Sequence, residues 1–169
     1  MVKRLVYQVV RYYCRFVVRI FFGKVEIIGK ENIPKDQPVI YSSNHQNAFM
    51  DALIIGGLSP KTTYSVTRSD VFKKKYEWFM DAFNMIPIYR IRDGFSQLAK
   101  NEETFRRINR CLSQGHALTI FSEGNHGNDF FLRSLSKGSS RMALEAQEKM
   151  DHLDLQIIPI GLNYFHHQR

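Results

Sequence analysis

A histidine and an aspartate near the start of the sequence have the residue types and the spacing to move a proton. His45 and Asp51 enclose the stretch QNAFM, residues 46–50. A carboxylate bonded to an imidazole fixes its tautomer and stabilises the imidazolium that forms, so such a pair can act as a general base on a hydroxyl. Taken alone, a pair of this kind is more often structural than catalytic. Other motifs in the sequence are needed to distinguish the two interpretations.

Two further parts of the chain carry side chains suited to a phosphorylated substrate. Arg90 and Arg92 follow the apolar run IPI, and an arginine presents a fork of donors that fits a phosphate. Residues 122–129 form a dense polar loop, in which His126 is a candidate contact to an acceptor, and Lys137 follows as a weaker phosphate candidate.

The sequence offers no enzyme nucleophile in a known setting. Cys14 and Cys111 have neither metal nor redox spacing, and no serine lies in a Gly-x-Ser-x-Gly motif. A hydroxyl of the substrate is therefore the better candidate nucleophile. The remaining histidines are scattered without ligand spacing, so we expect no metal.

Alternating strands and helices must position these residues. The expected strands cover residues 24–29, 39–43, 62–67, 86–92, 117–121 and 155–161. The expected helices cover residues 51–57, 101–114 (with Asn101 as N-cap) and 139–149. This alternation predicts an α/β fold: a single domain with a mostly parallel central sheet flanked by helices. The His45 and Glu123 loops each follow an expected buried strand, where α/β proteins place their ligands.

Residues 1–22 predict an amphipathic helix. Its polar face would carry Arg4, Gln8, Arg11, Arg15 and Arg19. Its apolar face would carry Leu5, Val6, Val9, Val10, Tyr13, Phe16, Val17 and Ile20. A basic face opposite such an apolar face is typical of a helix that lies on a membrane surface. The alternative is a helix that packs on its own domain. Residues 68–80 interleave cations with large apolar side chains. They would form either a solvated helix with a core stripe or a second patch that faces the membrane or the acyl chain.

The charge of the chain favours an anionic partner. The formal net charge is +8, and residues 1–92 hold 15 Lys and Arg against 7 Asp and Glu, whereas the remainder is balanced at 9 against 9. Phospholipid head groups and phosphorylated substrates fit this excess. Nucleic acid is not expected, because no recognised nucleic-acid motif is present. An apolar content of 44% excludes a disordered chain.

Four short blocks follow one another in an informative order. Asn-His ending in Asp comes first, then Ile-Pro-Ile-Tyr-Arg, then Phe-Ser-Glu-Gly, then Ile-Ile-Pro-Ile-Gly. This series resembles the glycerolipid acyltransferase family, which includes lysophosphatidic acid and glycerol-3-phosphate acyltransferases, and the resemblance runs from about Gly29 to Tyr164. The segments GKENIP and KGSSRMALEA also look like connecting segments of that family.

The resemblance implies acyl transfer from a thioester to a glycerolipid hydroxyl. His45 would take the proton of the hydroxyl, and Asp51 would orient His45. Arg90, Glu123 and Gly124 would bind the glycerol phosphate of the acceptor. Asn125 and Lys137 are further candidates for substrate binding. Acyl-CoA or acyl carrier protein would be the co-substrate, with no further cofactor.

The implied organisation is an interfacial helix, residues 1–23, followed by an acyltransferase domain, residues 24–169. We expect a peripheral or monotopic protein on the cytoplasmic face of a membrane, with membrane lipid as its partner. The chain ends soon after the fourth block, whereas members of this family continue further, so we also expect a C-terminally truncated form.

Two departures from the family pattern require compensation. The family places four residues between the histidine and the aspartate, but this chain has five. Because a helix advances about 100° per residue, a bulge or a longer loop must restore the pairing, or Asn47 must share the orienting role. In the third block Ser122 replaces a proline, and Asn125-His126 replaces Thr-Arg. Without that arginine, Arg90 or Arg92 would carry more of the phosphate binding.

Several functions remain open at this point. The acceptor would be 1-acyl-glycerol-3-phosphate, glycerol-3-phosphate or another lysolipid. A peripheral lipid-binding protein with the same fold but without catalysis is the alternative from a different class.

Overall fold

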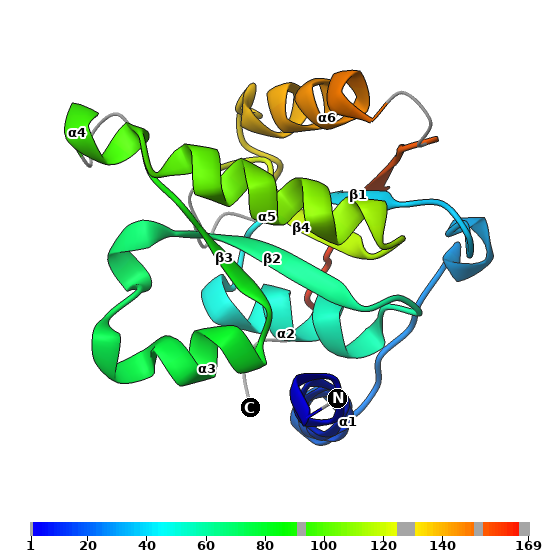
Figure 1. The fold of residues 1–169 in the computed structure, drawn as a ribbon. Helices are drawn as coiled ribbons and strands as arrows, with labels where there is room; N and C mark the ends of the chain where they lie inside the picture. The colour runs from blue at the N-terminus through cyan, green and yellow to red at the C-terminus, as the bar shows by residue number, and fades with distance from the viewer. Residues whose placement is uncertain (1, 91–93, 125–130, 151–153, 166–169) are drawn as a thin grey trace.

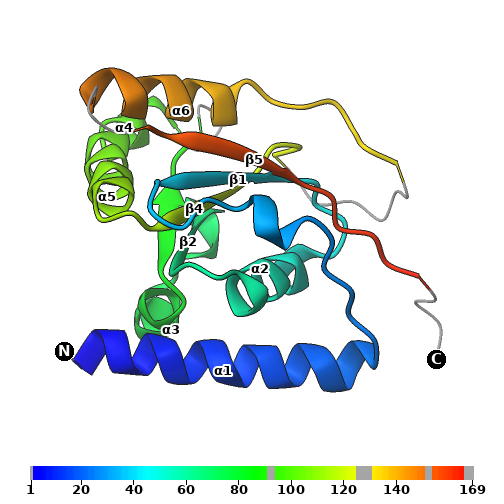
Figure 2. The ribbon, with the colours of Figure 1, turned by 90° about the vertical axis from the view of Figure 1, so that its right-hand side faces the viewer.

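The protein is a five-stranded parallel sheet with helices on both faces, shown in Figures 1 and 2. The computed structural model describes residues 2–90, 94–124, 131–150 and 154–165. The strands are β1 (Val39–Ser43), β2 (Thr63–Arg68), β3 (Met85–Ile88), β4 (Ala117–Phe121) and β5 (Gln156–Ile160). Their spatial order is β3-β2-β4-β1-β5, and every neighbouring pair is parallel. The predicted α/β fold class is confirmed.

Successive side chains of the central strands point to opposite faces of the sheet and fill two separate cores. Ile40 and Leu118 pack with α5 (Asn101–Ser113) and α6 (Gly138–Lys149) on one face. Val39 and Tyr41 pack with Ile55 of α2 (Ala48–Leu58) on the other face. The central strands are apolar on both sides because both faces are covered, as parallel sheets require.

The helix α1 (Val2–Phe22) lies along the face of the domain that α2 covers (Figure 2). Among the side chains of α1 whose burial is described, residues 4–22, a narrow stripe is buried against the domain, and it consists of Tyr7, Cys14 and Val18. A Cβ atom placed on Gly57 of α2 would lie 3.3 Å from the backbone nitrogen of Arg15, so this glycine allows the close approach of the two helices. The Arg11 guanidinium donates to the carbonyl oxygen of Ser59, directly after α2.

The outer face of α1 is apolar and uncovered. The side chains on this face include Leu5, Val9, Tyr13, Phe16 and Ile20, each of which is about 60–66% exposed. Most of the apolar face predicted from the sequence therefore points away from the domain, and a different stripe makes the intramolecular contact. No helix within the described ranges combines the length and apolar character that a membrane span requires.

The expected strand at residues 24–29 is wrong. This segment connects α1 to the 3-10 turn η1 (Lys30–Asn32) without pairing to the sheet, and Ile28 is 89% exposed. Alternation alone cannot make a strand, because a strand also needs a neighbouring edge with free backbone groups.

Residues 69–82 form two short 3-10 turns and a short α-helix rather than one long helix. They comprise η2 (Ser69–Val71), η3 (Lys74–Tyr76) and α3 (Glu77–Ala82). Met80 is buried, whereas Trp78 is 71% exposed beside the exposed Lys74 and Lys75. The helix α3, which carries Trp78, contacts α1 (Figure 1).

The expected strand over residues 86–92 ends at Ile88, and Arg92 lies outside the described residues. A short helix not predicted from the sequence, α4 (Phe95–Leu98), precedes α5. The expected capping role of Asn101 is also wrong. Its side-chain amide instead accepts from the backbone N–H of Tyr89 at 3.0 Å and donates to the Tyr89 carbonyl at 2.8 Å, which fixes the chain just before Arg90.

Candidate active site

His45 and Asp51 form a hydrogen-bonded dyad at the carboxyl edge of the sheet. Nδ1 of His45 lies 2.8 Å from Oδ2 of Asp51. The Asp51 side chain has no exposed surface, whereas the imidazole is 16% exposed. A carboxylate only accepts hydrogen bonds, so Nδ1 carries the hydrogen and Nε2 is left with its lone pair. This is the tautomer that a general base on a hydroxyl needs.

The extra residue between His45 and Asp51 is accommodated by an unusual backbone conformation. Ala48, at the start of α2, has a φ of +39°, in the left-handed region that residues other than glycine rarely adopt. The predicted bulge is therefore confirmed, and the dyad closes despite the five-residue spacing. The backbone N–H of Asn47 also donates to Oδ2 of Asp51 at 2.9 Å, which helps to hold this carboxylate in place.

The His45 loop is bonded to the segments that follow both neighbouring strands. On the β5 side, the Asn44 side chain accepts from Leu162 N–H at 2.7 Å and donates to the Leu162 carbonyl at 2.9 Å. On the β4 side, the His45 N–H donates to Oε1 of Glu123 at 3.2 Å. The His45 ring stacks on Phe121 with centroids 3.9 Å apart and planes inclined by 14°. These contacts fix both the backbone and the ring plane of His45.

Both carboxylate oxygens of Glu123 bond to the protein. Oε1 accepts from His45 N–H, and Oε2 accepts from Nε of Arg133 at 2.8 Å. The Glu123 side chain is only 2% exposed, so a charged partner such as Arg133 offsets the cost of burying its charge. In the described contacts Glu123 therefore holds a neighbouring cation.

Ser122 makes two bonds that the proline of the family pattern could not make. Its N–H donates to the Ser43 carbonyl at 3.1 Å, and its hydroxyl lies 2.6 Å from that of Ser42. Proline has neither group. This departure from the pattern therefore ties the β4 loop directly to β1, beside His45.

The other predicted binding residues are spread along the edge of the sheet. Arg90 follows β3, and its Nη2 lies 3.7 Å from an oxygen of Asp70. Three strand spacings separate β3 from β1, or about 14 Å at 4.7–4.9 Å each. Lys137 is exposed at the start of α6. The described contacts do not bring Arg90 or Lys137 into direct contact with His45.

The loop after β4 is described only in part. Gly124 has a φ of +73°, and its N–H donates to the Phe121 carbonyl at 3.0 Å. The predicted contacts Asn125 and His126 lie outside the described residues. Arg133 is linked to the His45 backbone through the carboxylate of Glu123, which bonds to both.

Two residues of the site were missed by sequence reasoning. Arg133 lies in a segment without a pattern, and no local signal distinguishes it. Tyr164, whose hydroxyl donates to Oδ1 of Asp51, follows β5 by four residues. The rule that parallel strands end at one edge, applied to the last strand as it was to β1 and β4, points to the segment that contains it.

The cysteines and the acidic residues suggest no other chemistry. Cys14 and Cys111 are both buried and unpaired, and burial raises the pKa of each thiol. A thiol with a raised pKa is a poor nucleophile at neutral pH. Within the described residues, no group of three or more His, Cys, Asp or Glu side chains is arranged to hold a metal ion.

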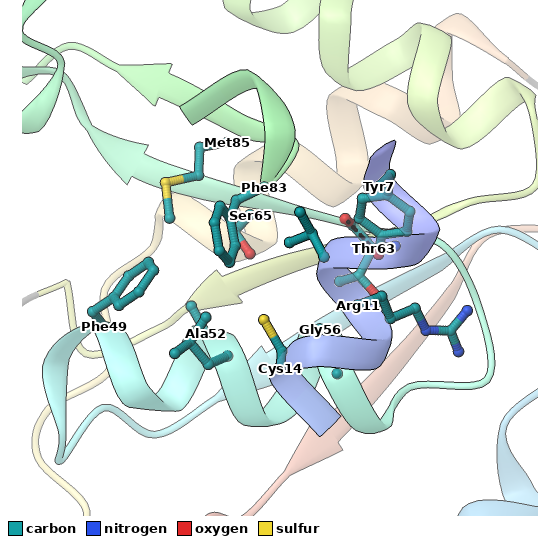
Figure 3. A pocket seen from close by; sticks show the side chains of 13 residues that line it. Tyr7, Arg11, Cys14, Phe49, Ala52, Gly56, Thr63, Ser65, Phe83 and Met85 are labelled. Atoms are coloured by element: carbon teal, nitrogen blue, oxygen red, sulfur yellow. Dashed lines mark hydrogen bonds between the residues drawn. The ribbon is translucent and has the colours of Figure 1, made fainter. Parts of the chain in front are cut away.

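An apolar pocket lies between α1, α2 and the sheet. Figure 3 shows its lining, to which α1 contributes Tyr7 and Cys14, and α2 contributes Phe49 and Ala52. Its free volume is about 30 Å³, which is room for a single water molecule. Neither His45 nor Asp51 is among the residues that line this pocket.

Several known proteins are similar to this chain in sequence or in fold. A family model described as Acyltransferase matches residues 24–163. The chain is 29% identical over 142 residues to a 1-acyl-sn-glycerol-3-phosphate acyltransferase of Chlamydomonas reinhardtii, across 83% of this chain and 39% of that protein. It is 32% identical over 65 residues to an uncharacterized acyltransferase of Schizosaccharomyces pombe, across 38% of this chain and 10% of that protein.

A solved structure shares the fold. The crystal structure of PlsC, the 1-acyl-sn-glycerophosphate (LPA) acyltransferase of Thermotoga maritima, superposes with a TM-score of 0.61 at 19% identity, across 94% of this chain and 68% of that chain. The chain spans about two fifths of the Chlamydomonas relative and a tenth of the yeast relative. With a family model matched over most of its length, and with the dyad and the parallel sheet in place, the chain belongs to the glycerolipid acyltransferase family.

Proposed function

We propose that this protein transfers an acyl group from acyl-CoA or acyl carrier protein to the hydroxyl of 1-acyl-glycerol-3-phosphate, giving phosphatidic acid. The observation that carries the proposal is the 2.8 Å contact between His45 and the fully buried Asp51 at the carboxyl edge of the sheet. This contact leaves Nε2 of His45 as the base. Membership of the family supports the reaction type, and the Chlamydomonas relative supports the acceptor.

The reaction requires one proton acceptor and no enzyme nucleophile. Nε2 of His45 takes the proton of the acceptor hydroxyl as its oxygen attacks the thioester carbonyl carbon. The tetrahedral intermediate collapses, the carbon–sulfur bond breaks, and the thiol leaves with the proton that His45 returns. Asp51 stabilises the imidazolium between these two steps. The buried thiols of Cys14 and Cys111 play no part.

The acceptor phosphate requires a cation near the dyad. We assign Arg133 as the primary candidate and Arg90 as a more distant one. β4, which leads to Glu123 and Arg133, is the direct neighbour of β1, whereas β3 is three spacings away. The family arginine absent from the third block would thus be replaced by one further along the chain. Glu123 orients Arg133, and Lys137 and Gly124 would lie at the periphery.

The outer face of α1 supports attachment to a lipid surface. Contiguous exposed apolar surface of this kind is uncommon on monomeric proteins and marks a membrane or protein contact. The exposed Trp78 with Lys74 and Lys75 adds aromatic and basic groups beside α1, a combination suited to anionic head groups. We place this surface on the cytoplasmic face of a membrane, where anionic lipids are concentrated, with the protein peripheral or monotopic.

Thiol release from acyl-CoA tests the activity directly. Vesicles carrying 1-acyl-glycerol-3-phosphate, glycerol-3-phosphate in solution, and vesicles carrying a lysophospholipid with a zwitterionic head group are compared as acceptors. The first is expected to give the highest rate. His45→Ala should lower kcat by about 10²–10⁴-fold, the usual contribution of a general base. His116→Ala, which removes a histidine outside the dyad, is the matched control and should retain activity.

Other outcomes separate the alternatives. Preference for another acceptor identifies a glycerol-3-phosphate or lysolipid acyltransferase. Vesicle binding without thiol release from any acceptor identifies a non-catalytic lipid-binding protein. Equal rates for wild type and His45→Ala would exclude the proposed base.

Vesicle sedimentation tests the lipid-facing surface separately. Leu5→Ser changes an outer residue of α1 that is 66% exposed, and Leu144→Ser changes a 65% exposed leucine on α6. Burying a leucine side chain contributes about 1.5–3 kcal/mol, so Leu5→Ser should weaken binding to anionic vesicles by about 10- to 100-fold. Leu144→Ser should leave it unchanged, and an equal loss in both variants would contradict the assignment.

A further inference from the structure

Asp51 receives more hydrogen bonds than its partnership with His45 requires. Oδ2 accepts from Nδ1 of His45 and from the backbone N–H of Asn47. Oδ1 accepts from the hydroxyl of Tyr164. Tyr164 comes from the segment after β5, 113 positions away in the sequence. A residue so distant has been brought to the one oxygen of the carboxylate that faces away from His45.

Two contacts fix the position of Tyr164. The segment that carries it is bonded to the His45 loop by the reciprocal Asn44–Leu162 pair, two residues before the tyrosine. Its ring packs against Phe22, at the end of α1, with centroids 5.6 Å apart. Tyr164 therefore joins the catalytic carboxylate to the carboxyl end of the helix that carries the lipid-facing surface.

We propose that Tyr164 is a positioning residue of the reaction: it holds Asp51 in the orientation that aligns His45, and Phe22 at the end of α1 seats the tyrosine ring. The proposal rests on the proposed function of the dyad. Tyr164 acts through Asp51 and does not touch the reacting atoms. No feature of the four sequence blocks assigns this role to the residue.

The tyrosine is suited to this task because it remains a donor. Burial, and then the neighbouring Asp51 carboxylate, raise the pKa of Tyr164 well above that of an ordinary tyrosine. The hydroxyl therefore stays protonated throughout the pH range of an assay. As a permanent donor it locks the carboxylate torsion and withdraws part of the negative charge that Oδ2 would otherwise direct at His45.

The direction of the pH effect follows from that sharing of charge. Without the Tyr164 hydroxyl, Asp51 presents more negative charge to the imidazole and favours its protonated form. His45 acts as a base only when neutral, so the acidic limb of the kcat–pH profile should move to higher pH. The other charged groups that the described contacts bring to the dyad are Glu123, on the loop after β4, and its partner Arg133. Both are unchanged by a substitution at Tyr164.

Tyr164→Phe is the direct test, because it removes one oxygen and keeps the ring on Phe22. We expect kcat to fall about tenfold, the effect of losing one hydrogen bond to a charged group, with the KM of the acceptor little changed. Tyr41→Phe is the matched control. It removes another buried tyrosine hydroxyl, bonded to Ser59 Oγ at 3.1 Å, from the strand that leads to His45. It should lower thermal stability without changing the pH profile.

A readout that does not depend on activity separates this proposal from the reaction itself. The protonation of the His45 ring can be followed by NMR in wild type and in Tyr164→Phe, and its midpoint should rise in the variant. Phe22→Ala should move it in the same direction by a smaller amount, and serves as the second variant if Tyr164→Phe does not fold. If the wild type lacks acyl transfer, the proposed function fails while the titration still tests the contact.

Two outcomes would overturn the role of Tyr164. One is a Tyr164→Phe protein with unchanged kcat and an unchanged His45 midpoint. The other is a loss of thermal stability equal to that of Tyr41→Phe with no movement of the pH profile, because that result describes a structural hydroxyl.

Discussion

The loops after β1 and β4 follow adjacent strands and end at the same edge of the sheet, yet they use their charged side chains differently. The β1 loop presents His45 with Nδ1 bonded to Asp51 and Nε2 directed away from that bond. The β4 loop turns the carboxylate of Glu123 inward, where it binds the His45 backbone and Arg133. The first loop carries the proposed base, and the second supplies contacts that fix its backbone.

This difference shows that a strand end determines where a residue lies but not what it does. A carboxylate that is 2% exposed and bonded at both oxygens has little capacity left for a ligand. The bond from Nδ1 of His45 to Asp51 sets the tautomer in which Nε2 carries the lone pair. The partners of each polar group therefore separate catalysis from support, and substitutions at the two loops should have different signatures.

The largest effect should come from the dyad itself. Asp51→Asn places an amide opposite Nδ1 of His45 and favours the wrong tautomer, so kcat should fall by about 10³–10⁴-fold while the KM of the acceptor stays nearly constant. Steady-state kinetics with 1-acyl-glycerol-3-phosphate measures both constants. Asp70→Asn, a change at the exposed aspartate near Arg90, is the control and should leave kcat within about threefold. A fully active Asp51→Asn protein would remove the distinction between the two loops.

An intermediate effect should come from Arg133. Lysine keeps the charge that Glu123 needs but lacks the planar fork suited to a phosphate, so Arg133→Lys should raise the KM of a phosphorylated acceptor by about tenfold with little change in kcat. The same change at Arg90, three strand spacings from β1, should have a smaller effect. If Arg133→Lys instead lowers kcat equally for acceptors with and without phosphate, Arg133 acts only by holding Glu123.

The smallest effect should come from the bulge that closes the dyad. Ala48 lies at a positive φ that costs a non-glycine residue about 1–3 kcal/mol. Ala48→Gly should therefore retain or slightly increase the free energy of unfolding in urea and keep activity. Ala52→Gly, in the same helix at an ordinary φ, should lose about 0.5–1 kcal/mol. Equal losses in the two glycine variants would show that the left-handed turn is not strained.

Much of the site was predictable because chemistry and periodicity are local properties. The pairing of His45 with Asp51 follows from residue types at the end of an apolar run, and the need for a bulge follows from the rotation per residue of a helix. The strand expected at residues 24–29 failed for a different reason. Its alternation was real, but pairing depends on a partner edge, and a sequence window contains no information about which edges are free.

By itself the sequence determined the alternation of strands and helices, the four blocks, the dyad and the amphipathic character of α1, because each depends on residue type and spacing within a few turns. The tertiary structure alone decided which face of α1 meets the domain, that Glu123 pairs with Arg133, and that Tyr164 completes the shell of Asp51. These contacts join segments up to 113 positions apart. They exist because parallel strands deliver their carboxyl ends to one edge, where residues without any local signal become neighbours.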